Sequence, residues 1–189
     1  GFISNKVVAV FLGPSGMALL GNFRNLGAML KSVATLGIST SLVKLVAENK
    51  ENKTALSELY ATFLSIFIII SSFLAIGVFF FAETIGQLLF HSNQWTIPIR
   101  IVGLSLPLVL LTTFWLAIYN GLEQFKTIVL IQLVSSVLVF IVTISLIYFE
   151  AIDGAIWAIA LSELLMVLVT FVFVVKDKRF FQFNFRFLI

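Results

Sequence analysis

The feature that most constrains this chain is a series of long apolar runs, of which residues 55–82 form the clearest example. That run holds one charged residue, Glu58. A transmembrane helix needs about 20 consecutive, predominantly apolar residues. Across the chain 60% of the residues are hydrophobic and only 11% are charged, whereas soluble domains carry about 25% charged residues. Lipid is therefore the expected solvent, and the expected fold class is all-α, a polytopic transmembrane helix bundle.

Short polar breaks divide the chain into about six expected spans. These are residues 1–12, 17–46, 55–82, 97–119, 127–149 and 155–175. The first is about half of a span, and the chain begins with Gly1, so we expect this helix to be truncated. Residues 176–189 follow the last span and are expected to be cytoplasmic or interfacial.

Two of the polar breaks carry specific local predictions. Residues 13–16, "GPSG", predict a tight turn from which Pro14 starts the next helix. Trp95, in the break before residue 97, suits a position at the level of the lipid headgroups.

The charged residues in the breaks predict how the bundle is oriented. One set of breaks carries Lys44, Lys50, Lys53, Lys126, Lys176, Lys178 and Arg179. The opposite set carries Arg100 with Glu83, Glu150 and Asp153. Because cytoplasmic loops are enriched in lysine and arginine, the lysine-bearing side and the N-terminus are expected in the cytoplasm of a multi-pass protein.

Three cations fall inside the expected spans: Lys6, Arg24 and Lys31. A charge at the centre of a bilayer costs about 2.5–3.5 kcal/mol on insertion scales, and such residues usually face an interior cavity. Arg24 and Lys31 are seven residues apart, which places them within about 20° of each other on one helix face, and Asn25 is adjacent to that face. In a straight helix, Lys31 would lie about 10 Å deeper than Arg24. The second span should therefore carry a cationic stripe.

A cluster of buried cations predicts an anionic ligand. Phosphate or pyrophosphate suits arginine, whose planar fork meets phosphate oxygens in pairs, while chloride and carboxylates stay open. Lys6 has a simpler interpretation, in which it reaches to the outer interface.

Polar side chains also lie within the last two expected spans. Glu163 would pair with a cation such as Arg24, or titrate and couple transport to an ion. Gln132, Ser135 and Ser136 are most simply interhelical hydrogen-bonding contacts.

Several classes of function lack support in the sequence. The chain has no cysteine and one histidine, His91, so thiolate and multi-histidine metal sites within it are excluded. The net charge of +3 is small, and nucleic-acid binding is not indicated. No nucleophile–base set or glycine-rich phosphate loop appears. We therefore expect neither an enzyme nor a bound cofactor.

The chain contains the motifs "NKVVAVFLGPSGMALLGNFRNL" (residues 5–26) and "LGISTSLVKLVAE" (residues 36–48). Both resemble motifs of the Wzx-type O-antigen translocases, which belong to the multidrug/oligosaccharidyl-lipid/polysaccharide exporter superfamily. The two motifs supply a lysine-bearing helix, the LGP-x-G turn, the N-F-R stretch at Arg24 and the Gly37-Ile38 pair. "YNGLEQFK" and "DGAIWA" match the wider superfamily.

This resemblance implies two six-helix lobes around a central cavity. Residues 1–175 would be the N-terminal transmembrane lobe, and residues 176–189 a cytoplasmic or interfacial connector to a missing second lobe. The resemblance also implies a flippase that moves undecaprenyl-pyrophosphate-linked oligosaccharide from the cytoplasmic to the periplasmic leaflet of the bacterial inner membrane. The family's cavity cations would correspond to Lys6, Arg24 and Lys31. The bilayer, the lipid-linked substrate and other polysaccharide-assembly membrane proteins are the implied partners.

Two other functions stay open at this point. A cation-coupled multidrug antiporter of the same superfamily would be expected to use cavity acids, and this chain shows more cations than acids in its spans. A non-transporting membrane scaffold would use the same charges for pairing with a partner.

Overall fold

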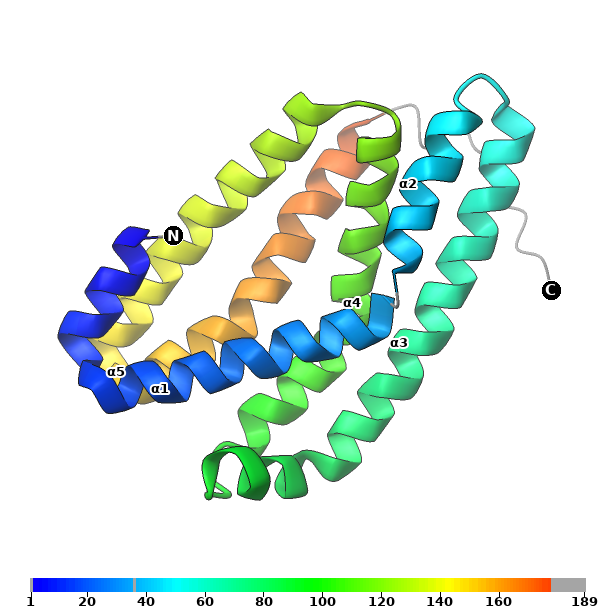
Figure 1. Ribbon diagram of the computed structural model, residues 1–189. Coiled ribbons are helices and arrows are strands. Elements are labelled where there is room, and N and C mark those ends of the chain that lie inside the picture. Colours follow the sequence, from blue (N-terminus) through cyan, green and yellow to red (C-terminus); the bar gives the residue numbers. More distant parts are fainter. Residues whose placement is uncertain (1, 36, 178–189) are drawn as a thin grey trace.

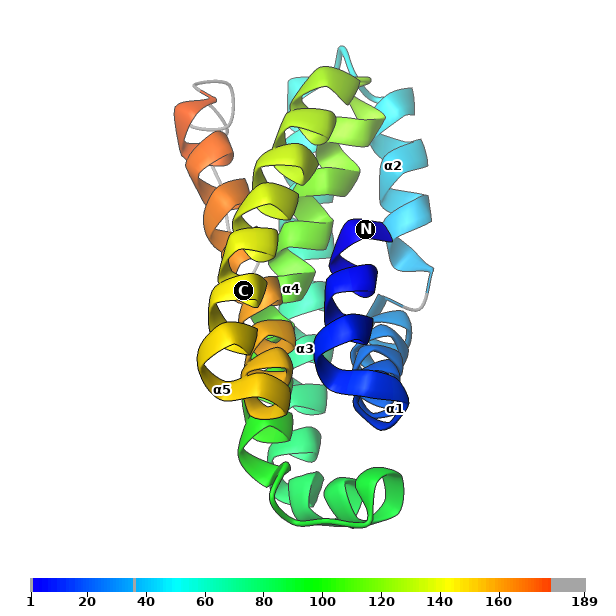
Figure 2. The same ribbon diagram turned by 90° about the vertical axis from the view of Figure 1, so that its left-hand side faces the viewer.

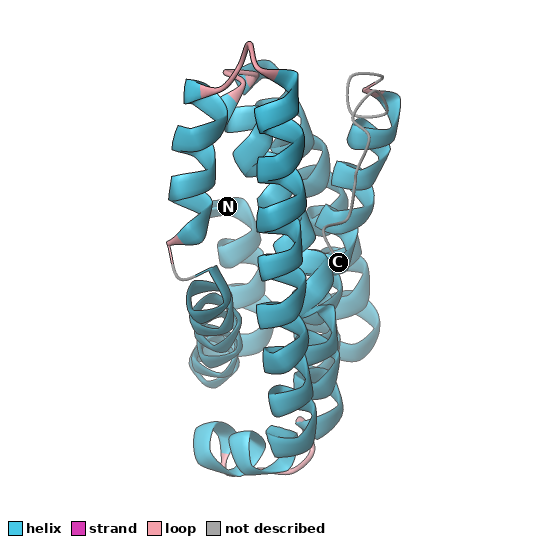
Figure 3. Cartoon of the chain, turned by 90° about the vertical axis from the view of Figure 1, so that its right-hand side faces the viewer, coloured by secondary structure: helices cyan, strands magenta, loops and turns pink. Residues whose placement is uncertain are grey.

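The computed structural model describes residues 2–35 and 37–177, and the side chains of residues 2–12, 15, 151, 152 and 160 lie outside the described part. The helices are α1 (Phe2–Thr35), α2 (Ile38–Glu48), α3 (Lys53–Phe90), α4 (Thr96–Gly121) and α5 (Phe125–Lys176). Short turns join them, and the described part contains no strand (Figures 1 and 3). The expected all-α fold class is confirmed.

Four helical segments are long and apolar enough to cross a membrane: Lys53–Phe90, Thr96–Gly121, Phe125–Glu150 and Asp153–Lys176. The last two are the halves of α5, which turns back on itself between them (Figure 1). A fifth candidate span is the bent pair Gly16–Thr35 and Ile38–Glu48. By length and composition the described residues therefore supply four candidate spans, or five if the bent pair is one span, and the chain is a multi-pass membrane protein.

Two glycines with positive φ break the N-terminal helices. Gly13, at φ 66° and ψ −173°, kinks α1 directly before Pro14, as the "GPSG" turn predicts. Gly37, at φ 74°, lies in the left-handed region, which glycine enters without the steric penalty of a Cβ atom. At Gly37 the axis bends by 51° between Gly16–Thr35 and Ile38–Glu48.

The bend at Gly37 corrects the expectation of one straight helix over residues 17–46. Gly16–Thr35 lies obliquely across the bundle, whereas α2 runs alongside α3 and α4 (Figures 1 and 2). A rise of about 1.5 Å per residue along an oblique helix does not convert directly into depth. The expected 10 Å difference in depth between Arg24 and Lys31 therefore does not follow.

An aromatic cluster anchors the oblique part of α1. Phe23, only 1% exposed, stacks on Phe90 with ring centroids 4.3 Å apart and meets the edge of Trp95 at 6.1 Å. The stacking partner Phe90 is the last residue of α3, which ends beyond its expected end at residue 82. These contacts also bury Trp95, which is 6% exposed and packs against protein rather than standing among lipid headgroups.

Ion pairs join the loops at both ends of the bundle. Lys50 Nζ lies 2.7 Å from Glu123 Oε1, which ties the α2–α3 loop to the α4–α5 turn at one end (Figure 1). Arg100 pairs with Glu83 at 3.2 Å toward the other end and lies 5.3 Å from the centroid of the Phe79 ring. The Lys50–Glu123 and Arg100–Glu83 pairs therefore lie toward opposite ends of the bundle, as the alternation of the polar breaks predicts. The cytoplasmic location of the lysine-bearing end stays a prediction.

Replacing Gly103 with alanine should destabilise the packing of α4 on α3. A Cβ atom at Gly103 would lie 2.6 Å from Val78 Cγ1, and valine has little rotamer freedom in a helix with which to move away. We expect a cost of about 1–3 kcal/mol, measured as a lower midpoint of thermal unfolding. Gly77→Ala is the matched control, because nothing lies within 4 Å of its Cβ position. Equal midpoints for the two variants would contradict the packing, and Val78→Ala should rescue Gly103→Ala.

Candidate functional site

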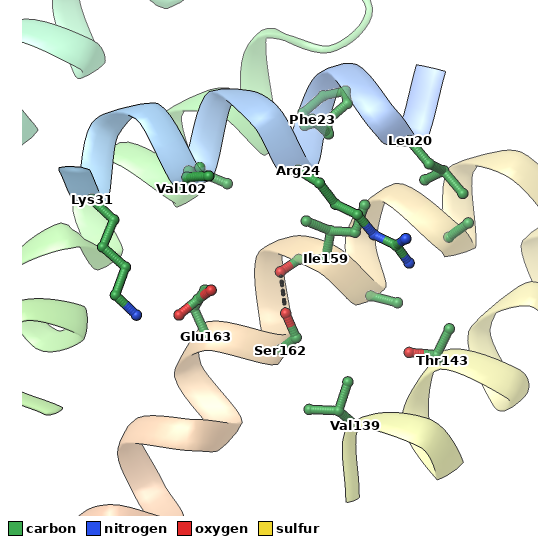
Figure 4. Close-up of a pocket in the computed structure, with 14 residues that line it drawn as sticks. Leu20, Phe23, Arg24, Lys31, Val102, Val139, Thr143, Ile159, Ser162 and Glu163 are labelled. Atoms are coloured by element: carbon green, nitrogen blue, oxygen red, sulfur yellow. Dashed lines mark hydrogen bonds between the residues drawn. The ribbon is translucent and has the colours of Figure 1, made fainter. Parts of the chain in front are cut away.

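A cavity of about 400 Å³ lies between the oblique part of α1, α4 and both halves of α5. Its walls are mostly apolar and include Leu20, Phe23, Val102, Val139 and Ile159. Five side chains with polar or charged groups also line it: Arg24, Lys31, Thr143, Ser162 and Glu163 (Figure 4). Two cations and one carboxylate thus line a small, partly open cavity among apolar helices.

The two cations reach this cavity from one face of α1. Figure 4 shows Lys31 pointing toward the side of the cavity that holds Glu163, and Arg24 pointing toward the side that holds Thr143. Phe23 holds this part of α1 against α3 and α4 through its contacts with Phe90 and Trp95. The aromatic anchor therefore fixes where Arg24, the next residue, enters the cavity.

The carboxylate comes from the second half of α5. Glu163 is half-buried and forms no ion pair with another described side chain. The pairing of Arg24 with Glu163 that the sequence left open is therefore not formed in this structure. Beside it, Ser162 Oγ donates a hydrogen bond of 2.7 Å to the Ile159 carbonyl oxygen of its own helix.

The structure brings three of the five predicted site residues together: Arg24, Lys31 and Glu163. Asn25 is exposed next to Arg24 and does not line the cavity. The Lys6 side chain lies outside the described part of the chain.

Sequence reasoning missed Thr143 and Ser162 in the lining of the cavity. Thr143 follows Ser136 by seven residues, which places both on one helix face, and Ser162 adjoins Glu163. The seven-residue spacing from Ser136 and the position next to Glu163 are the sequence features that could have indicated Thr143 and Ser162.

A metal centre finds no support among the residues that the structure describes. They contain no group of three or more histidine, cysteine, aspartate or glutamate side chains placed to hold a metal ion. The chemistry available in the cavity is the binding of charged and hydrogen-bonding groups.

The chain is similar in sequence to lipid III flippases. Over 104 residues it is 31% identical to the lipid III flippases of Escherichia coli (strain K12) and Shigella flexneri. That match covers 55% of this chain and 25% of each relative, so the chain spans only part of the relatives' length. No solved structure matches it. The model of the family described as "Polysaccharide biosynthesis protein" matches residues 1–189, and the chain therefore belongs to that family.

Proposed function

We propose that the full-length protein is a flippase for a lipid-linked oligosaccharide. Its cargo would be a polyprenyl pyrophosphate that carries an O-antigen or related sugar unit. Transport would run from the cytoplasmic to the periplasmic leaflet of the bacterial inner membrane, with the N-terminus in the cytoplasm. The similarity to lipid III flippases supports the transport of a lipid-linked precursor.

The observation that carries this proposal is that Arg24 and Lys31 both line one cavity between apolar helices. Cations at such positions are costly unless they face a cavity or a ligand. A pyrophosphate would accept charge-assisted hydrogen bonds from both side chains, while the prenyl chain stays in lipid. Lys6 stays a predicted third cation, and Asn25 a predicted contact beside the cavity.

Alternating access would move the cargo across the bilayer. The second lobe implied by the family resemblance would close the cavity from the other side. No bond is made or broken, so the proposed activity is transport and not catalysis.

Reconstituted vesicles would test the proposed function. The full-length protein is inserted into vesicles, and the transfer of a fluorescent polyprenyl pyrophosphate oligosaccharide between leaflets is followed by its accessibility to a quencher. We expect transfer well above that of protein-free vesicles, and unlabelled polyprenyl pyrophosphate should compete. Transfer at the background rate would contradict the proposal, and transport of cationic drugs by the same vesicles would favour an antiporter.

Glu163 is the proposed ion-coupling residue, because it places one carboxylate opposite the cations (Figure 4). Glu163 and a bound pyrophosphate would both be anionic, and at an effective dielectric constant of about 20 two such charges in one small cavity repel by an energy on the order of 2 kcal/mol. We therefore expect Glu163→Gln to tighten the binding of polyprenyl pyrophosphate by up to about tenfold after screening. The same variant should lose the response of transport to an imposed proton gradient.

The matched control for this prediction is Glu150→Gln, because Glu150 is exposed and does not line the cavity. Binding by isothermal calorimetry and transport with and without the gradient should both match wild type in the control. If Glu163→Gln binds no more tightly and keeps its gradient response, Glu163 is neither a competitor of the anion nor the coupling group.

A further inference from the structure

A polar face on the first half of α5 continues from the cavity toward the lysine-bearing end of the bundle. Gln132, Ser136 and Thr143 lie within about 40° of one another on a helix that turns about 100° per residue. Thr143 and Val139, on the same face, line the cavity (Figure 4). From Thr143 to Gln132 this face extends by about 16 Å. We call the face formed by Gln132, Ser136 and Thr143 the polar track.

The polar track stands out against the rest of this helix. Gln132 and Ser136 are exposed, and residues 132–143 carry no charge. Large apolar side chains cover the neighbouring directions, among them Leu133, Val137, Leu138 and Ile141, each exposed by 38% or more. Exposed polar groups in a membrane helix are costly against lipid and generally face water, protein or a ligand.

Hydrogen bonding separates the polar track from the other polar residues in α5. Ser145 and Thr170 donate to carbonyl oxygens of their own helix, Ile141 at 2.9 Å and Met166 at 2.8 Å. Gln132, Ser136 and Thr143 form no hydrogen bond with another described residue. The interhelical bonds expected for Gln132 and Ser136 are therefore not formed within the described chain, and their donors and acceptors stay available.

We propose that the polar track binds the neutral, hydroxyl-bearing sugars of the cargo. An amide and two hydroxyls each offer both a donor and an acceptor, as sugar hydroxyls do, and the lack of charge suits uncharged sugars. Thr143 lines the cavity that holds the cations, and Ser136 and Gln132 follow about 10 Å and about 16 Å farther along the helix, where the sugars that follow the pyrophosphate would lie. This inference rests on the proposed function, and it names the chemistry and the place of the sugar subsite.

The test compares two lipids on the full-length protein. The probes are polyprenyl pyrophosphate and polyprenyl pyrophosphate that carries a neutral disaccharide. The variant is Gln132→Leu with Ser136→Ala, and the control is Ser145→Ala, whose hydroxyl already bonds to its own helix. We expect the double variant to bind the glycosylated lipid about tenfold more weakly, as for two modest hydrogen bonds. Its affinity for the bare lipid should stay within about twofold of wild type, and the control should match wild type for both.

The remaining outcomes separate this inference from the proposed function. A wild-type protein that binds bare lipid but gains nothing from the disaccharide overturns the sugar subsite and leaves the flippase standing. Equal weakening of both lipids, or a lower unfolding midpoint in the double variant alone, assigns the polar track to packing against protein and overturns it as well. A wild-type protein that binds neither lipid removes the proposed function and the subsite together.

Discussion

Replacing Arg24 and Lys31 together with alanine will weaken the binding of polyprenyl pyrophosphate by at least about 100-fold. Hydrogen bonds to charged groups contribute about 1.5–3 kcal/mol each, and about 1.4 kcal/mol is a factor of ten. Both side chains line the same cavity, so one anion would lose both partners at once. Transport in vesicles should fall to the background rate.

Single variants show how much each property of the two cations contributes to the binding of polyprenyl pyrophosphate. Arg24→Lys should keep the charge but lose the paired geometry of the guanidinium, and so bind with an affinity between wild type and Arg24→Ala. Lys44→Ala is the matched control, because its side chain is 77% exposed and pairs with Glu48 outside the cavity. Wild-type binding by the double alanine variant would exclude these cations as the pyrophosphate site.

Replacing Phe23 with alanine should produce the largest loss of stability of any single change considered for this chain. Phenylalanine-to-alanine changes in packed cores cost about 3–5 kcal/mol, and Phe23 is 1% exposed between Phe90 and Trp95. The variant should unfold at a clearly lower temperature in detergent. It should also bind polyprenyl pyrophosphate more weakly, because the anchor that orients Arg24 is lost.

The control for this second prediction comes from the same helix. Met29 is 67% exposed, so Met29→Ala removes a side chain of similar length without opening a hole in the protein. Comparable unfolding temperatures for the two variants would show that Phe23 does not hold the oblique part of α1.

The sequence predicts most of the helices but not how the second span is built. Hydropathy locates residues 55–82, 97–119, 127–149 and 155–175, because each apolar run has polar residues at both ends. Residues 17–46 have no such polar break at Gly37, so their composition suggests one helix. The break arises from a backbone conformation, φ 74° at one glycine, which hydropathy does not report.

The sequence indicates the individual charged residues of the candidate site, but it does not indicate that they line one cavity. Arg24, Lys31 and Glu163 are conspicuous because each is a charge within an apolar span. Their meeting in one cavity depends on the contact between α1 and α5, which lie far apart in the sequence (Figure 4). Thr143 is conspicuous only after the cavity is known, because a threonine in a membrane helix commonly bonds to its own backbone.

The volume of the cavity has a consequence for the range of glycans that one such protein would transport. About 400 Å³ is near the lower end of the range for pockets that enclose a drug-sized molecule. In the proposed function, the part of the cavity that this chain lines would hold the diphosphate and little more than the first sugar, and the outer sugars would lie along the polar track and beyond it. Selectivity would then depend on the reducing end of the glycan, and chains of different length that share this end would be accepted alike.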